Sequence, residues 1–381
     1  MKIVIAPDSF KESLSAAAVA SAIESGFRQI FPNASYYLLP LADGGEGTVE
    51  VLLEGLQGQA MYNWVQGPQG KPVHAMWALL DDGQTALIEI AAASGLDLIP
   101  KQERMATTAS SFGTGELIQS ALDHGVKRIL LGLGGSATTD GGAGILQALG
   151  ASLKDAQGQE IEPGGLALNQ LASIDVSNLN QRCKDVEFII ACDVANPLCG
   201  EEGAAFVFGP QKGATPEQVS ALDMGLENFA NLAHQVLGCH HGSTKGFGAA
   251  GGAALGLALA FTVELKSGID MVLDSLDADA LLQDADLVIT GEGQMDNQTL
   301  QGKTPYGIAK RAQNLGIPVI GIAGSLGTEV DDLYSKIDCV FGTVRSPQQL
   351  DQVLSEAHSN LQRTARNVAA TLLMGSTLNL Q

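Results

Sequence analysis

Four segments of the chain combine glycines with an acidic residue, which suits the binding of phosphate together with a divalent cation. Glycine lets backbone N–H groups approach a ligand closely, and N–H groups at the start of a helix attract an anion. Aspartate and glutamate offer the oxygen ligands that magnesium prefers. Each segment alone is also ordinary turn chemistry, so the inference depends on the set: residues 42–48, 112–116, 133–142 and 290–296.

Two lysines stand close to segments of this kind and could contact a phosphate or a carboxylate group. Lys11 follows the polar run Asp8-Ser9 near the N-terminus, and Lys212 lies in the glycine-containing segment 208–214. Each lysine also has a simpler interpretation. Lys11 could be a solvated side chain in a first helical turn, where lysine mildly opposes the helix dipole. Lys212 could belong to a plain turn.

Asp193 is a candidate general base or metal ligand, because it follows an apolar run at residues 186–192. It could instead cap a turn with the Asn196-Pro197 pair. Hydroxyl groups in the long glycine segment could donate hydrogen bonds to phosphate, or could cap the helix expected after it. The residues that carry these hydroxyl groups are Ser136, Thr138 and Thr139.

Alternating apolar and amphipathic runs at both ends of the chain predict an open α/β sheet. Strands are predicted at 2–6, 36–41, 286–290, 318–323 and 339–344. Helices are predicted after Ser13 or Ser15, at 49–56, 308–314 and 330–336, and along 347–373. The glycine–acid segments in these regions follow the carboxyl ends of predicted strands, which is where such sheets bind ligands.

The middle of the chain has a different pattern. Residues 73–80 and 85–91 predict a β-hairpin, and predicted strands at 128–133 and 186–192 precede the long glycine segment and Asp193. We therefore predict an α/β protein with a discontinuous architecture. Residues 1–65 and 270–381 would form one doubly wound domain, and residues 66–269 would form an inserted domain with a mixed sheet.

Composition limits the classes of function. A chain of 381 residues with 45% hydrophobic residues can form two domains with large cores. A net charge of -21 argues against nucleic acid and anionic membrane as partners. Five cysteines without a C-x-x-C motif, and an N-terminus that turns polar early, predict a reducing, cytoplasmic location. The uncharged run 246–263 is short for a membrane span and predicts a buried helix.

Several common catalytic motifs are missing. Gly302-Lys303-Thr304 imitates the end of a Walker A motif, but Asn297 stands where its first glycine should be. No G-x-S-x-G motif of serine hydrolases occurs. Two patterns at 132–137 and 246–251 are similar to dinucleotide-binding motifs, which leaves a nicotinamide-dependent oxidoreductase of a small hydroxy acid as the alternative function.

The chain resembles the bacterial glycerate kinases that have no P-loop. The resemblance runs from the first strand to the last helix. It rests on Pro7-Asp8-Ser9-Phe10-Lys11-Glu12-Ser13 and on residues 42–48, 134–142, 191–198, 208–214 and 290–293. It implies phosphorylation of D-glycerate with ATP and Mg²⁺, giving 2-phosphoglycerate or alternatively 3-phosphoglycerate. It also implies that the domain built from both chain ends is flavodoxin-like.

Residue type and loop position then suggest roles in phosphoryl transfer. Asp193 is the leading candidate for the base and Asp8 the second, while Lys11 and Lys212 would contact phosphate or the substrate carboxylate. Substrate and nucleotide would also contact Ser9, Gly134, Gly135, Ser136, Thr138 and Thr139. The candidates for binding magnesium are Asp43, Glu46, Glu292 and Asp296. The sequence leaves open whether the protein is a monomer or a homo-oligomer.

Overall fold

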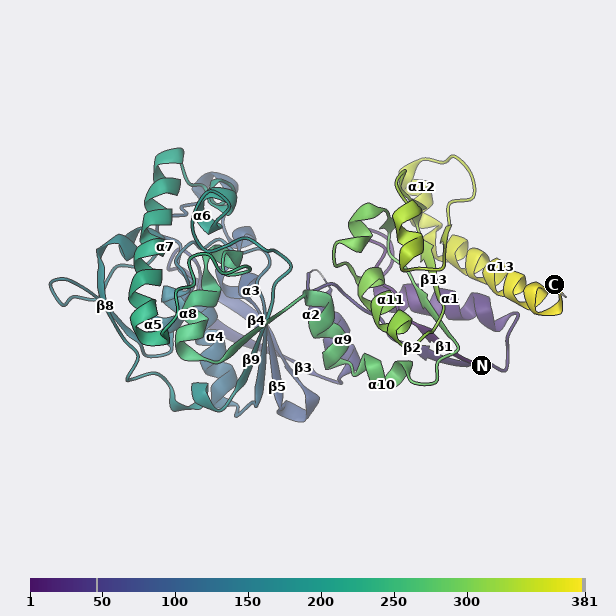
Figure 1. Cartoon of the computed structure of the whole chain (residues 1–381), viewed down its shortest axis with the longest axis horizontal. Coiled ribbons are helices and arrows are strands. Elements are labelled where there is room, and N and C mark those ends of the chain that lie inside the picture. Colours follow the sequence, from purple (N-terminus) through teal and green to yellow (C-terminus); the bar gives the residue numbers. More distant parts are fainter. Residues whose placement is uncertain (46, 379–381) are drawn as a thin grey trace. The chain divides into compact units, whose positions relative to one another are not determined.

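The computed structural model describes residues 1–45 and 47–378, which divide into two compact units (Figure 1). Unit 1 comprises Met1–Gly55 and Ser267–Gln381, and unit 2 comprises Leu56–Lys266. The first division falls earlier than the joint expected near residue 65. The reason is that strand β3 (Gln59–Gln66) pairs along its length with β4 (Pro72–Leu80), so the whole hairpin belongs to unit 2.

Within the described part of unit 1, five strands form one parallel sheet in the order β15-β13-β11-β1-β2. Numbered along this unit alone, the order is 2-1-3-4-5, which is the flavodoxin-like arrangement. The chain moves from β1 to one side and from β11 to the other, so these two strands flank the point where the winding reverses. The strands are β1 (Lys2–Ile5), β2 (Ser35–Leu38), β11 (Leu287–Thr290), β13 (Val319–Ala323) and β15 (Cys339–Gly342).

Helices cover both faces of this sheet, as right-handed crossovers in opposite directions require. On one face α1 (Ala16–Arg28) and α13 (Ala357–Thr377) pack together over a cluster that includes Ile3 and Ile289 (Figure 1). On the other, α11 (Thr304–Asn314) contacts β11 and β13. The remaining helices of unit 1 are α2 (Thr48–Gly55), α9 (Gly268–Ser275), α10 (Ala278–Leu282) and α12 (Leu350–Ser355).

Local signals explain several boundaries in unit 1. The hydroxyl oxygen of Ser15 accepts a hydrogen bond from the N–H of Ala18 at 3.3 Å and so caps α1, as one of the two predicted caps. The helix predicted along 347–373 is divided at Glu356 into α12 and α13. The segment predicted as helical at 330–336 is a 3₁₀ helix, η9 (Asp331–Ser335). Two short strands, β12 (Gln294–Met295) and β14 (Ser325–Leu326), pair in parallel beside the main sheet.

The described residues of unit 2 form a six-stranded mixed sheet in the order β10-β9-β6-β5-β4-β3. The predicted hairpin is confirmed, because β4 pairs antiparallel with β5. Strands β5, β6, β9 and β10 are parallel, so their carboxyl ends share one edge. Besides β3 and β4, the sheet contains β5 (Thr85–Glu89), β6 (Arg128–Gly132), β9 (Glu187–Ala191) and β10 (Val263–Lys266). A separate two-stranded ribbon contains β7 (Ser152–Asp155) and β8 (Leu171–Asp175).

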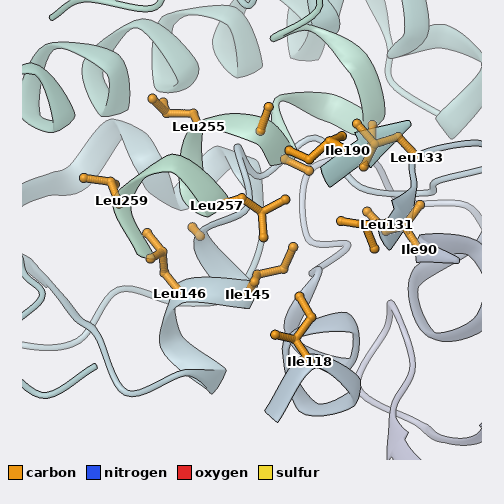
Figure 2. Close-up of a cluster of buried hydrophobic side chains, with 14 of the residues drawn as sticks. Ile90, Ile118, Leu131, Leu133, Ile145, Leu146, Ile190, Leu255, Leu257 and Leu259 are labelled. Carbon is orange, nitrogen blue, oxygen red and sulfur yellow. The ribbon is translucent and has the colours of Figure 1, made fainter. Parts of the chain in front are cut away.

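The core of unit 2 lies between this sheet and its helices. Figure 2 shows Ile118 of α4, Ile145 and Leu146 of α5, and Leu257 of α8 converging with Leu131 of β6. Helix α8, in the uncharged run expected to be buried, is apolar on all sides and is enclosed. The helices are α3 (Ile90–Ser94), α4 (Phe112–Asp123), α5 (Ala143–Ala148), α6 (Ala204–Phe208), α7 (Pro216–Leu237) and α8 (Ala253–Ala260). In the part of the chain that is described, no helix combines the length and the apolar character needed to cross a membrane.

Candidate functional site

Two acidic side chains follow the strands at which the winding of unit 1 reverses. Asp8 comes after β1 and Glu292 comes after β11. The backbone pairing continues past both strands, since the N–H of Asp8 donates to the carbonyl oxygen of Gly291 at 2.8 Å. Open α/β sheets bind their ligands at this position, so both carboxyl groups lie where a sheet of this order would bind a ligand.

Asp8 is held by its neighbours in one orientation. Its Oδ2 accepts a hydrogen bond from the hydroxyl group of Thr304 at 2.6 Å, and its Oδ1 accepts one from the N–H of Ser9 at 2.6 Å. Burial nevertheless raises the pKa of Asp8, and the nearby charge of Asp43 raises it further. A carboxyl group with a raised pKa at a strand end is a candidate for proton transfer or for binding a cation.

Glu292 is 7% exposed and has two partners. The hydroxyl group of Thr299 donates to Oε1 at 2.6 Å, and the ammonium group of Lys303 lies 3.3 Å from Oε2. Burial is the main cause that raises the pKa of Glu292, and the charge of Asp8 adds to it. Lys303 and Thr304, which the sequence showed only as an incomplete Walker A motif, thus orient both carboxyl groups from the start of α11.

These groups line a cavity of about 590 Å³ within unit 1, which is in the range of small-molecule sites. Lys11 and Ser9 line it as well, together with Asp43. Asp296 is not among the described residues that line it, and its Oδ1 caps the 3₁₀ helix η8 (Asn297–Leu300) by accepting the N–H of Gln298 at 2.9 Å. The fourth magnesium candidate, Glu46, lies outside the described residues.

A second group of polar side chains gathers in unit 2 around the loop from β6 to α5. Lys212, in the 3₁₀ helix η6 (Pro210–Lys212), is only 3% exposed. Its ammonium group donates to the hydroxyl oxygen of Ser136 at 3.0 Å and to the carbonyl oxygen of Thr138 at 2.5 Å. Burial lowers the pKa of Lys212 to about 7, and the charge of Asp140 opposes that change.

The hydroxyl groups of Thr138 and Thr139 are buried and have no hydrogen-bond partner. Such groups are rare in folded proteins, and each calls for an explanation such as an absent ligand or water. Gly134 and Gly135, at the tip of the same loop, are exposed. The structure therefore brings the candidates from 134–139 together with Lys212. These residues are more than seventy positions apart in the chain, so the sequence did not predict that they lie close together.

Asp140 is a residue of this loop to which the sequence assigned no role. It is fully enclosed, and its carboxylate accepts hydrogen bonds from the N–H and the hydroxyl group of Ser111 and from the N–H groups of Gly142 and Gly144. Burial raises the pKa of Asp140. The side chain thereby fixes the loop and the start of α5. In the sequence, only its position between two threonines and two glycines could have indicated this role.

Asp193 is exposed and follows β9 at the edge that also carries the 134–142 loop. The edge is shared because β9 and β6 are parallel neighbours with Ala191 opposite Gly132. The second dinucleotide-like pattern, at 246–251, packs against these loops by backbone contact. A Cβ atom on Gly251 would lie 2.0 Å from the carbonyl oxygen of Thr138, so this glycine is required for packing.

The segment at 112–116 is not a loop. It forms the first turns of α4, and the carboxylate of Glu116 accepts the N–H of Gln66 in β3 at 2.6 Å. Gly113 allows close packing, since a Cβ atom there would lie 1.8 Å from the carbonyl oxygen of Gln66, and Glu116 holds the same residue by its hydrogen bond. Across the described ranges 1–45 and 47–378, no group of three or more His, Cys, Asp or Glu side chains is arranged to hold a metal ion.

Comparisons with known proteins agree on one family. A model described as the glycerate kinase family matches residues 3–373. A glycerate kinase of Bacillus subtilis (strain 168) is 51% identical over 381 residues, 100% of both chains. A glycerate 2-kinase of Escherichia coli (strain K12) is 50% identical over 376 residues, 98% of this chain and 99% of the other. A crystal structure of the Salmonella typhimurium LT2 protein provisionally named glycerate kinase 2 matches with a TM-score of 0.91 and 52% identity, covering 99% of this chain and 100% of that one. None of these names supports the oxidoreductase alternative.

Proposed function

Because this chain belongs to the glycerate kinase family, we propose that it transfers the terminal phosphoryl group of ATP to the 2-hydroxyl group of D-glycerate. The observation that carries the proposal is the agreement in family over nearly the whole chain. The product, 2-phosphoglycerate, is supported by the name of the Escherichia coli relative, glycerate 2-kinase.

The side chains of this protein suit the chemical needs of such a transfer. Phosphoryl transfer depends on positioning and on neutralising charge, with an acid group to accept the hydroxyl proton. Asp193 remains our first candidate for that base, because it is exposed at a strand end beside the 134–142 loop. Asp8 is the second, because its raised pKa favours uptake of a proton.

Cationic and hydroxyl groups would hold the anionic reactants. In unit 2 the unpartnered hydroxyl groups of Thr138 and Thr139 and the buried ammonium group of Lys212 offer donors to an oxyanion. In unit 1 the exposed Lys11 lines the cavity beside Ser9 and could contact a phosphate group or the carboxylate of glycerate.

The carboxyl groups of unit 1 suit magnesium. Mg²⁺ is usually held by one or two carboxylates together with phosphate oxygens of the substrate, so a cluster of three acids is not required. Asp43 and Glu292 line one cavity with Asp8, and the charge of Asp43 raises the pKa of Asp8 while that of Asp8 raises the pKa of Glu292. When bound with ATP, the cation would neutralise part of the phosphate charge. Asp43 and Glu292 would orient the phosphates through it.

The test is an assay of ADP release by the purified protein with ATP, Mg²⁺ and D-glycerate, after which the product is given directly to enolase. We expect glycerate-dependent ADP release and immediate enolase turnover, because enolase consumes 2-phosphoglycerate. Turnover only after phosphoglycerate mutase is added would assign the 3-hydroxyl group instead. Folded protein that releases no ADP with glycerate would contradict the proposed activity.

A further inference from the structure

The cavity of about 590 Å³ in unit 1 has walls of two chemical kinds. One end is polar and contains the carboxyl groups already described with Lys11 and Lys303. The other end is apolar and comes from the segment after β15 and from α12: Val344, Leu350, Val353, Leu354 and Ala357. Loops after four of the strands of the sheet, β1, β11, β13 and β15, contribute to the same cavity.

The apolar end is unusually exposed for hydrophobic side chains. Leu350 is 66% exposed and Val344 is 41% exposed, while Val353 and Leu354 are half-buried. Exposed hydrophobic groups that line a hollow are typical of a binding site for an apolar or aromatic group. A three-carbon hydroxy acid has no such group and would leave most of this volume empty.

A polar atom in this wall also lacks a partner. The side-chain amide nitrogen of Gln348 donates to Glu356 at 3.2 Å, whereas the amide oxygen is buried and accepts no hydrogen bond. A buried acceptor without a donor is unfavourable. An amino group on an aromatic base bound at this wall is a donor of the right kind for this oxygen.

We propose that this cavity binds the nucleotide, with the base against Val344, Leu350 and Leu354 and the phosphates at the end that contains Lys11, Asp43 and Glu292. The proposal rests on the proposed kinase function, because that function requires a nucleoside triphosphate. It adds where the nucleotide binds, which neither the family nor the names of the relatives state. A lining that combines apolar with charged side chains suits a ligand that has a base and phosphates.

Leu350→Asp is the variant that tests the apolar end. Leu350 is the first residue of α12 and is mostly exposed, and an aspartate in a first turn is favourable to a helix, so the variant should fold. We expect the Kd for ADP with Mg²⁺, measured by calorimetry, and the KM for ATP to rise about tenfold, the loss expected when a leucine contact is removed. The KM for glycerate should stay within about twofold of wild type, which is within the scatter of neutral surface changes.

Leu315→Asp is the matched control. Leu315 is a 52% exposed leucine of unit 1 at the end of α11, and it is not among the residues that line the cavity. This variant should bind ADP as wild type does. The proposal is overturned if Leu350→Asp binds ADP with unchanged Kd, or if its KM for glycerate rises while its KM for ATP does not.

The binding measurement separates this proposal from the proposed activity. Calorimetry with ADP needs no phosphoryl acceptor, so it locates the nucleotide even if glycerate is not the substrate. Wild-type protein that binds ADP in a Leu350-dependent manner but does not phosphorylate glycerate would contradict the proposed function alone. Wild-type protein that turns over glycerate while Leu350→Asp leaves nucleotide binding intact would contradict the location alone.

Discussion

Both units hold ionisable side chains beside loops that follow strands, but the charges of these side chains differ. In unit 1, the carboxyl groups of the half-buried Asp8 and the buried Glu292 accept hydrogen bonds from the hydroxyl groups of Thr304 and Thr299, and Lys303 approaches Glu292. In unit 2, the buried ammonium group of Lys212 donates to neutral oxygens. The site in unit 1 thus has two carboxyl groups with a lysine beside one of them, and the site in unit 2 has a buried lysine near the buried carboxyl group of Asp140.

The difference indicates which ligand would stabilise the charged form of the ionisable groups at each site. Burial disfavours the charged form of both kinds of group, so it raises the pKa of the acids and lowers that of Lys212. A cation bound with phosphates would favour the ionised acids of unit 1, and an oxyanion would favour the protonated lysine of unit 2. Perturbed groups of this kind are frequent at functional sites.

The largest effect on kcat is expected from a variant that tests which unit supplies the general base. Asp193→Asn should lower kcat by about 10²–10⁴, the usual contribution of a general base, because asparagine cannot accept the hydroxyl proton. Steady-state kinetics with saturating ATP and glycerate measure it. Activity of folded Asp193→Asn within a few-fold of wild type would exclude this role and leave Asp8 in unit 1 as the candidate.

Asp185→Asn is the control for that experiment. Asp185 is also exposed and stands just before β9, at the opposite end of the strand that Asp193 follows. Both variants remove one negative charge near the same strand. Only a change at the carboxyl end should therefore lower kcat, and an equal loss in both variants would indicate a general electrostatic or structural effect.

A smaller effect is expected from Lys212→Met, which keeps the length of the side chain but removes its charge. We expect kcat/KM at pH 7 to fall about 10- to 100-fold, the loss expected for a hydrogen bond to a charged group. The two tryptophans, Trp64 and Trp77, both lie in unit 2, so their fluorescence reports on the unfolding of that unit.

The same variant tests the lowered pKa of Lys212 through the pH dependence of the free energy of unfolding. The folded pKa of about 7 lies below the ordinary 10.5, so unfolding takes up a proton between these values. The free energy of unfolding of the wild-type unit should therefore rise as the pH increases from about 7 towards 10.5. Lys212→Met should lack this part of the pH dependence in urea titrations. An identical pH dependence in both proteins would contradict a buried lysine with a lowered pKa.

The smallest effect is expected in the stability of unit 1. Asp8→Asn should raise the free energy of unfolding at pH 7 by about 0.5–2 kcal/mol, the usual range for a single stabilising substitution. The folded pKa of Asp8 is raised, so its ionisation opposes folding above that pKa. The gain should disappear as the pH falls and the wild-type carboxyl group becomes protonated.

Calorimetry measures the unfolding of the whole protein, and tryptophan fluorescence measures the unfolding of unit 2. Comparing the two signals separates the units in this experiment. A stabilised unit 1 with an unchanged unit 2 is the expected result. Destabilisation of unit 1 at pH 7 would mean that the hydrogen bonds from Thr304 and Ser9 to the ionised carboxylate outweigh its burial. Asp8 would then serve mainly to hold the loop after β1.

Local patterns in the sequence predicted the five strands of the unit 1 sheet and β4, β5, β6 and β9 of unit 2. Short apolar runs become buried strands because they bury both faces of a parallel sheet, as β1 and β11 do. Ser15 begins α1 for a local reason, its hydrogen bond to the backbone. The same patterns placed Asp8, Lys11 and Glu292 after strands, and parallel strands bring their carboxyl ends together. These features depend on neighbours within a few residues.

Other features depend on contacts between distant segments, which a local pattern does not encode. Thr304 donates a hydrogen bond to Asp8 across 296 positions of the chain. The segment that resembled an incomplete Walker A motif therefore orients two carboxyl groups. The segment 112–116 begins α4 and binds Gln66 of β3 across 50 positions through Glu116, and the 55/56 division follows from strand pairing. Lys212 was visible in the sequence only as a lysine in a turn. Its enclosure by Ser136 and Thr138, and with it the lowered pKa, came from the packing of the tertiary structure, because burial is a property of everything that surrounds a side chain.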